Sequence, residues 1–429
     1  MVPHLTTALA GPLLELEQRF LDRMPDIERW MRTQWQEHAV PFYASVDLRN
    51  AGFKLAPVDT NLFPGGFNNL NPAFLPLCVQ AIQTAVERVC ADARGVLLVP
   101  ENHTRNTFYL QNVETLQSIL QRAGMHVRLG SLIPDLKTAT VVELPAGGSL
   151  TLEPIVRTGR RVGLADFDPC MVLLNNDLSA GAPPILVDLD QPLAPPLAAG
   201  WHNRKKSHHF AVFHRVAKEF ATMLAIDAWL IDPYFGVCGK IDFHERAGEE
   251  CLASNVDVLL AKIKAKYAEY GIAEKPFAIV KADAGTYGMG IMTVRDASEV
   301  VGLNRKQRNK MAVVKEGLEV SSVIIQEGVP TFESIHEAIA EPVVYMIDRF
   351  VVGGFYRVHT ARARDENLNA PGAQFVPLAF ESPCIPDLGE PAGCPPNRFY
   401  AYGVVARLAQ IAAAIEVEEL SVVEDAVPA

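Results

Sequence analysis

The segment from residue 277 to residue 294 constrains the fold more than any other part of the sequence. Two apolar, strand-like runs, 277–281 and 291–294, are joined by a loop that contains Gly285, Gly288 and Gly290. Glycines at this spacing allow several backbone N–H groups to turn toward one anion. A Walker A loop or a dinucleotide-binding loop would lead into a helix, whereas this loop returns into a strand. The segment therefore predicts a phosphate-binding flap, with a plain hairpin turn as the alternative.

The residues beside this flap suit a nucleotide triphosphate. Such flaps close over ATP in protein kinases and in ATP-grasp enzymes, and the kinase signatures His-Arg-Asp and Asp-Phe-Gly are absent from this sequence. Lys281 ends the first strand, from which its ammonium group can reach a phosphate. A buried strand at 322–326 then ends in Gln326, Glu327, Gly328 and Val329. We expect this strand end to hold an adenine edge, with an acidic side chain near the ribose.

The amino-terminal half has a different pattern. Apolar strands at 96–99 and 171–174 alternate with helical segments such as 75–89, which predicts an α/β layer with a partly parallel sheet. Ligand groups in such sheets lie beyond the carboxyl ends of the strands. Asn102 and Asn175 follow these two strands and would suit a polar zwitterion, although asparagine also forms turns after strands.

The length of 429 residues and a proline-rich stretch at 183–196 indicate more than one domain. We expect an α/β protein, α+β in places, with an amino-terminal α/β substrate domain at 1–200. A second domain should span 201–415 and carry the flap at 281–291. The acidic end, 416–429, is expected to be frayed.

Composition excludes several classes of protein. The formal net charge of −11 disfavours nucleic acid as a partner. Seven cysteines without a Cys-x-x-Cys pair argue against a zinc site and a disulfide framework. We find neither a signal peptide nor an uninterrupted apolar run of roughly 18 residues, which predicts a cytoplasmic protein without membrane contact. The sequence leaves both a monomer and a homo-oligomer open.

The order of these motifs resembles one enzyme superfamily. The motifs occur in the same order as in glutathione-synthetase-like ATP-grasp enzymes. This order is the flap lysine Lys281, the glycine loop, the acidic residue Glu327, a hairpin at 341–358 and an asparagine-rich loop at 366–369. The segment 58–70 resembles the proteobacterial ATP-grasp-type glutamate-cysteine ligase family. This resemblance spans nearly the whole chain and implies an ATP-grasp fold for the second domain.

The resemblance also implies roles for matching residues. Lys240 and Lys281 resemble the two phosphate-binding lysines, and Arg357 resembles the arginine that stabilises an acyl phosphate. ATP and Mg²⁺ are the implied cofactors. The metal candidates are Asp348, Glu366 and Asn369, although the sequence Glu-Asn-Leu-Asn departs from the usual Glu-x-Asn pair. A solvated loop is the alternative for Glu366.

The implied reaction joins the γ-carboxylate of glutamate to the amine of cysteine through an acyl phosphate. It yields γ-glutamylcysteine, ADP and phosphate, the first step of glutathione biosynthesis. The candidates for binding the amino acids are Asp59, Asn61, Gly65, Gly66, Asn68, Asn102 and Asn175. For residues 64–66 the alternative is a tight turn packed by phenylalanines.

Other functions remain open from the residues alone. A ligase with another amine acceptor, a small-molecule phosphotransferase and a non-catalytic nucleotide-binding regulator would each use the same flap. The basic run 204–206 is expected to form a solvated turn, or else to line the nucleotide entrance.

Overall fold

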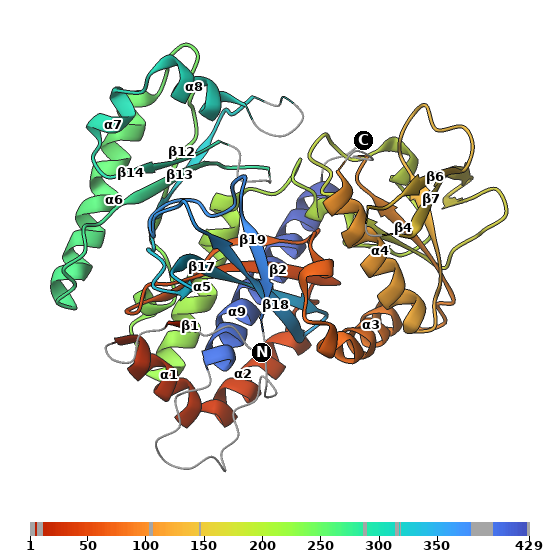
Figure 1. Cartoon of the computed structure of the whole chain (residues 1–429), viewed down its shortest axis with the longest axis horizontal. Coiled ribbons are helices and arrows are strands. Elements are labelled where there is room, and N and C mark those ends of the chain that lie inside the picture. The colour runs from red at the N-terminus through yellow and green to blue at the C-terminus, as the bar shows by residue number, and fades with distance from the viewer. Residues whose placement is uncertain are drawn as a thin grey trace.

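Figure 1 shows the computed structural model of the chain, which describes residues 5–6, 12–102, 106–145, 147–285, 290–313, 317, 319–378 and 398–426. Three larger sheets and one two-stranded sheet are surrounded by helices. The mixture of helices with a partly parallel sheet confirms the predicted fold class.

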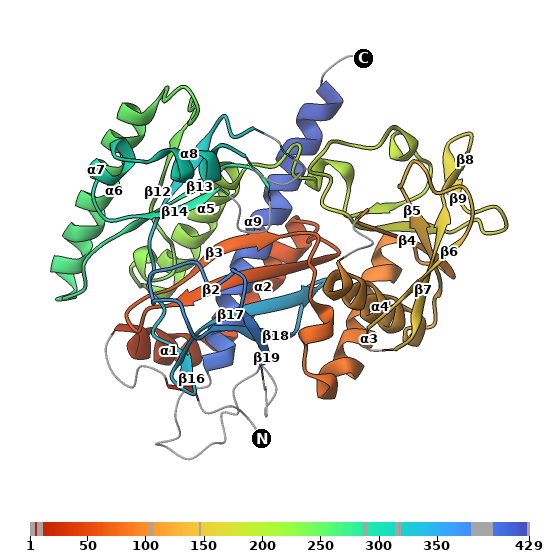
Figure 2. The same cartoon turned by 45° about the horizontal axis from the view of Figure 1, so that its top comes forward.

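The first sheet, which we call the central sheet, joins strands from both ends of the chain. β2 (Tyr43–Asn50) and β3 (Leu55–Asn61) pair with each other, and β2 also pairs with β17 (Ala338–Ile347). β18 (Phe350–His359) and β19 (Gln374–Pro377) continue beyond β17, and β16 (Ser334–Ile335) and β1 (Leu5–Thr6) form the other edge. Figure 2 shows these strands side by side. This sheet therefore contains strands from both sides of the predicted domain boundary at residue 200.

The second sheet, the parallel sheet, has the order β11–β10–β4–β5–β7–β6. Its strands are β4 (Gly95–Pro100), β5 (His126–Ser131), β6 (Thr140–Glu143), β7 (Ser149–Pro154), β10 (Met171–Asn175) and β11 (Leu193–Ala194). Only the pairing of β6 with β7 is antiparallel. Helices α3 (Leu75–Val89) and α4 (Thr107–Arg122) share a hydrophobic core with this sheet. β8 (Val156–Thr158) and β9 (Arg161–Gly163) form the separate pair.

The third sheet, the lid sheet, is antiparallel and contains the predicted flap hairpin. Its order is β12 (Phe235–Cys238), β15 (Val323–Glu327), β13 (Ala278–Ala282) and β14 (Ile291–Val294). The helices on this side are α6 (Glu249–Glu269), α7 (Ser298–Val301) and α8 (Arg305–Ala312). Residues 278–281 of β13 pair with residues 291–294 of β14, as the sequence predicts. Gly288 lies outside the described residues.

The long helix α9 (Arg398–Ala426) forms the core between the sheets and α5 (Lys206–Leu224), α1 (Pro12–Asp22) and α2 (Met24–Glu37). Within the described residues, its Phe399–Val422 segment is long and apolar enough to cross a membrane, but 89% of its most apolar 18-residue stretch is buried inside the protein. The expectation of a frayed end from residue 416 is wrong, because the helix continues to Ala426 and Glu416 is fully buried.

Short 3-10 turns connect these elements at Phe67–Asn69, Pro72–Phe74, Pro184–Leu186, Leu197–Ala199 and Ala228–Leu230. The first of these turns packs against α4.

Candidate active site

A cavity of ≈ 360 Å³ lies where the three larger sheets approach one another. The register of the central sheet explains its floor. Asp47 lies opposite Asp59 on β3 and Val343 on β17, and Glu341 lies opposite Arg357 on β18. Because alternate residues of a strand point to the same face, the side chains that line the cavity come from one face of this sheet.

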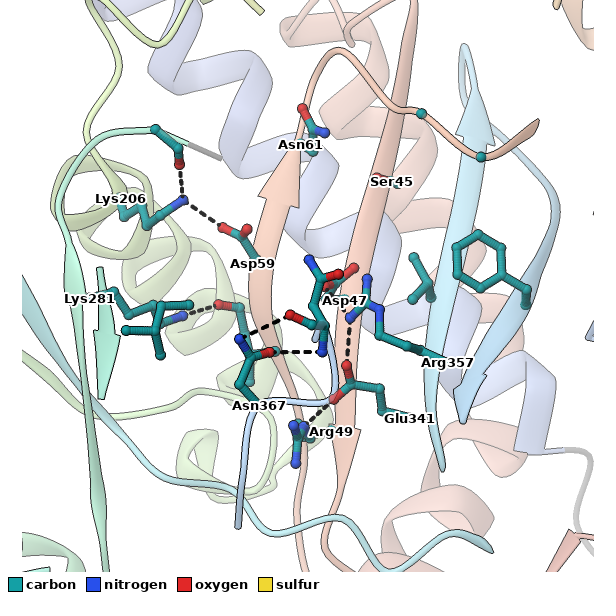
Figure 3. A pocket seen from close by; sticks show the side chains of 18 of the residues that line it. Ser45, Asp47, Arg49, Asp59, Asn61, Lys206, Lys281, Glu341, Arg357 and Asn367 are labelled. Atoms are coloured by element: carbon teal, nitrogen blue, oxygen red, sulfur yellow. Dashed lines mark hydrogen bonds and ion pairs between the residues drawn. The ribbon is translucent and has the colours of Figure 1, made fainter. Parts of the chain in front are cut away.

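Two lysines approach β3 from the lid side of the cavity (Figure 3). The Lys281 Nζ donates to the carbonyl of Val58 at 2.5 Å, and burial lowers its pKa to about 8, against the opposing effect of Asp59. The Lys206 Nζ donates to Asp59 Oδ1 at 3.1 Å and to the carbonyl of Gly285 at 2.9 Å. Both ammonium groups therefore lie near Asp59, and Lys206 also contacts the start of the glycine loop, where an anion would be stabilised.

Asp59 balances these two lysines. Burial would raise the pKa of its carboxyl group, but Lys206 and Lys281 bring the pKa below its ordinary value. Asp59 is thus ionised at neutral pH and holds Lys206 in place, while the ring of Trp201 lies 4.1 Å from the same ammonium. The expectation of a solvated turn is wrong for Lys206, which is buried and lines the cavity, as the alternative assignment had it.

An apolar recess adjoins the lysines. Phe277, Ile279, Ile291 and Val329 line it, and the Gln326 side chain lies on the same face of the lid sheet as Ile279. Gln326 Nε2 is buried and makes no hydrogen bond within the described part of the chain. A flat heterocycle with acceptor nitrogens would fill the recess and satisfy this donor.

Glu327 lines the cavity, but its carboxylate is bound by other residues of the protein. Its carboxylate accepts hydrogen bonds from Lys54 Nζ at 2.8 Å and from Trp229 Nε1 at 3.0 Å, and all three side chains are buried. The carboxylate also accepts from the backbone N–H of Tyr234 at 2.9 Å. Glu327 therefore contributes to the cavity as a fixed part of its wall, because a buried carboxylate requires such partners.

A second charged cluster occupies the far side of the floor (Figure 3). Arg357 Nη1 donates to Asp47 Oδ2 at 2.9 Å and to Glu341 Oε1 at 2.5 Å. Arg49 Nε lies 2.5 Å from the other oxygen of Glu341. Arg357 is thus brought into the cavity by the hairpin of β17 and β18, as the sequence predicts.

The turn at residues 64–67 borders the cavity. Asn112 Oδ1 accepts from the backbone N–H groups of Gly66 and Phe67 at 2.8 and 2.9 Å. Asn175 Nδ2 donates to the carbonyl of Pro64 at 3.0 Å. Asn175 therefore holds the turn in place, and it also lines the cavity together with Asn61, Gly65, Gly66 and Asn68.

The sequence matches the family model described as Glutamate-cysteine ligase over residues 17–417. The chain belongs to the glutamate-cysteine ligase family. A solved structure supports this: a protein from Methylobacillus flagellatus KT, provisionally named gamma-glutamylcysteine synthetase, is 65% identical, with a TM-score of 0.90. The match covers 98% of this chain and 99% of that one.

More distant structures add no argument. A D-alanyl-alanine synthetase A from Vibrio cholerae is 11% identical with a TM-score of 0.34, and 74% of this chain and 81% of that one are covered. A glutathione-synthetase-like effector from Globodera pallida is 9% identical with a TM-score of 0.35, and the match covers 80% of this chain and 77% of that one. The comparison with curated proteins gave no match.

Four predicted site residues in the described part of the chain do not line the cavity of this family member: Lys240, Gly290, Asn102 and Asp348. Lys240 is exposed just after β12, and Asn102 lines a separate pocket beside Asn176. Asp348 lies in the turn between β17 and β18, where its carboxylate pairs with Arg88 at 3.0 Å. The prediction of Asp348 as a metal ligand is wrong, because the turn carries it away from Glu366 and Asn369, which do line the cavity.

Oxygen ligands suited to Mg²⁺ are nevertheless present. Glu366, Asn367 and Asn369 line the cavity together, and carboxylate and amide oxygens are the ligands that this ion prefers in proteins. In the residues that the structure describes, no group of three His, Cys, Asp or Glu side chains is close enough to hold a metal. The loop therefore fits an ion that takes its remaining ligands from water and phosphate oxygens.

Alanine at Gly66 should raise the KM for the amino-acid substrates roughly tenfold, equivalent to about 1.4 kcal/mol of binding. Gly66 has φ +111°, and a Cβ there would lie 2.9 Å from the Tyr345 hydroxyl, so the turn must shift. Steady-state kinetics measure the effect. Gly147→Ala is the matched control, because its φ is +91° with no atom within 4 Å of the added Cβ. Equal KM values in both variants would contradict this placement of the substrate.

Proposed function

We propose that this chain joins the γ-carboxylate of L-glutamate to the amine of L-cysteine with ATP, and releases γ-glutamylcysteine, ADP and phosphate. The observation that carries the proposal is the pair of buried ammonium groups, Lys206 and Lys281, which lie near Asp59 in the cavity, with Lys206 also bonded to the start of the glycine loop. Membership in the glutamate-cysteine ligase family supports it. A cytoplasmic location and a substrate-binding role for residues 1–200 belong to the same proposal.

The cavity has a place for each part of the reaction. The apolar recess at Phe277 and Val329 would take adenine, with the Gln326 amide at its edge. The lysines would then neutralise the phosphates, which phosphoryl transfer requires more than it requires a covalent nucleophile. Glutamate would lie between the lysines and Arg357, with its γ-carboxylate toward the terminal phosphate.

Arg357 would stabilise the acyl phosphate formed from glutamate. Its guanidinium is buried on the floor of the cavity, where a charge interacts more strongly than in water. Mg²⁺, held by Glu366 and Asn369, supplies further charge neutralisation at phosphate oxygens when it is bound. The flap at 281–291 excludes water, which would otherwise hydrolyse the acyl phosphate.

The test offers the purified chain ATP, Mg²⁺, glutamate and a panel of amino acids, and identifies the product by mass. We expect ADP release to depend on both glutamate and cysteine and the product to be γ-glutamylcysteine. A small-molecule phosphotransferase would instead release ADP steadily with glutamate alone. A different condensed product would keep the ligase but change the acceptor, and nucleotide binding without turnover would overturn the proposal.

A further inference from the structure

Asp47 differs from the other carboxylates on the cavity floor. Its Oδ2 accepts from Arg357 Nη1 at 2.9 Å, but the described residues provide no hydrogen bond to its Oδ1. Its side chain remains 22% exposed, whereas the Glu341 side chain is 3% exposed. One oxygen of Asp47 is therefore available to a molecule in the cavity.

The positive charges near Asp47 neutralise its negative charge only in part. Burial raises the pKa of Asp47, and Glu341 and Asp59 raise it further, whereas Arg357 lowers it. Arg357 also serves Glu341, which has Arg49 as a second partner. The titratable and charged groups that face Asp47 are Arg357, Glu341, Asp59, Lys281 and Tyr345. The net effect favours uptake of a proton by Asp47 compared with an ordinary aspartate.

We propose that Asp47 is the general base that deprotonates the ammonium group of the acceptor amino acid. This inference rests on the proposed function. The ammonium group of a free amino acid is mostly protonated at neutral pH, so it must lose a proton before the nitrogen can attack. Asp47 lies beside Arg357, which would hold the acyl phosphate, so the base and the electrophile are adjacent.

The step balances as follows. The ammonium group gives one proton to Asp47 Oδ1, and the free electron pair of the nitrogen forms a bond to the γ-carbonyl carbon. The bond between this carbon and the phosphate oxygen breaks, and phosphate leaves with the electron pair. The second proton of the attacking nitrogen passes to the leaving phosphate. Asp47 releases its proton to solvent when the product departs.

The other carboxylates of the floor are less suited to this role. Each oxygen of Glu341 is paired with a guanidinium group and its side chain is 3% exposed, so neither oxygen is available to a molecule in the cavity. Asp59 is paired with Lys206, and its pKa is lowered. When Arg357 turns toward the acyl phosphate, its attraction for Asp47 weakens. Asp47 would then become a stronger base at the moment when the amine attacks.

Hydroxylamine provides the test, because it is unprotonated at neutral pH and attacks an acyl phosphate without a base. In Asp47→Asn we expect the cysteine-dependent rate to fall about 100-fold or more, and hydroxamate formation from glutamate and ATP to fall less than about tenfold. The cysteine-dependent rate of the variant should rise with pH as the free amine becomes more abundant. Asp190→Asn, in an exposed pair with Arg160, is the matched control for the side-chain change.

Each outcome decides one question. If the wild-type protein forms no hydroxamate, the proposed function fails irrespective of Asp47. If Asp47→Asn loses both reactions equally, Asp47 is a binding or structural residue and the inference is overturned. Asp47→Glu keeps a carboxylate, so it should keep the ratio of the two rates within about tenfold of the wild-type ratio. A ratio as low as that of Asp47→Asn would also overturn the inference.

Discussion

The Lys281→Ala variant should lose at least about 100- to 1,000-fold in the rate of ADP release with glutamate and cysteine present. Lys281 is buried at the end of β13 and points into the cavity beside β3. Removing its ammonium group leaves Lys206 as the remaining lysine that lines the described part of this cavity. A coupled assay of ADP release measures the effect, and a cooperative thermal transition verifies that the variant is folded.

Lys137→Ala is the control, because this exposed lysine only contacts the carbonyl of Pro134. Its ADP release should match that of the wild-type protein. Normal turnover in Lys281→Ala would remove the central assignment of the site.

The pH dependence of nucleotide binding should identify the same lysine. Burial lowers the pKa of Lys281 to about 8 in the protein without nucleotide. Bound phosphates favour the charged form, so nucleotide binding raises this pKa and takes up a proton above pH 8. Affinity for ADP should therefore fall as the pH rises through about 8. In Lys281→Arg the charge persists at these pH values, and calorimetric titration should show a flatter dependence.

The Arg204→Met variant should lose about 3–5 kcal/mol of stability at pH 7. Arg204 and Glu416 are both fully buried and form two hydrogen bonds, at 2.9 and 2.8 Å, that join the start of α5 to α9. Without the guanidinium group, the Glu416 carboxylate would keep its contact of 3.0 Å with the His209 ring but lose its arginine partner. Urea denaturation, followed by circular dichroism, measures the loss.

The stability that the Arg204–Glu416 pair contributes should decrease at acidic pH. Burial would raise the pKa of Glu416, but Arg204 and His209 bring it down to about 2, below its ordinary value of 4.5. The contribution of the pair is therefore fully present above pH 4.5 and is lost as the pH falls from 4.5 to 2. The difference between the wild-type protein and the variant should shrink over this range.

Two further variants separate pairing from burial. Arg204→Met combined with Glu416→Leu should recover most of the lost stability, since no unpaired charge remains. Arg215→Met removes one of the two partners of Glu419, the other being His208, at an exposed site nearby, and should cost less than about 1 kcal/mol. If Arg204→Met cost no more than Arg215→Met, the pair would not stabilise the junction of α5 and α9.

Local patterns predicted the parts of the site that local geometry forms. The hairpin of β13 and β14 follows from two apolar runs around a glycine loop, and Lys281 follows from its place at the end of the first run. The hairpin of β17 and β18 likewise brings Arg357 into the cavity. In each case neighbouring residues in the sequence determine where the side chain points.

Residues with distant partners could not be placed in this way. Lys206 belongs to a basic run that resembles a solvated turn, and only the packing of Trp201 and the position of Asp59 make it a buried site residue. The acidic end of α9 resembled a frayed tail because its basic partners lie some 200 residues earlier, on α5 and just before it. The period of a strand predicts which face is buried, but it does not identify the neighbouring strand.

The order in which the central sheet receives its strands has a consequence for biosynthesis. Asp47 and its partner Arg357 are 310 residues apart. At roughly 5–20 residues per second, a ribosome needs about 15–60 s to translate that interval. Throughout it, the nascent β2–β3 hairpin has an unpaired edge where β17 will later lie. We therefore expect chaperones that bind nascent chains to hold this hairpin. A prematurely terminated polypeptide should aggregate through it.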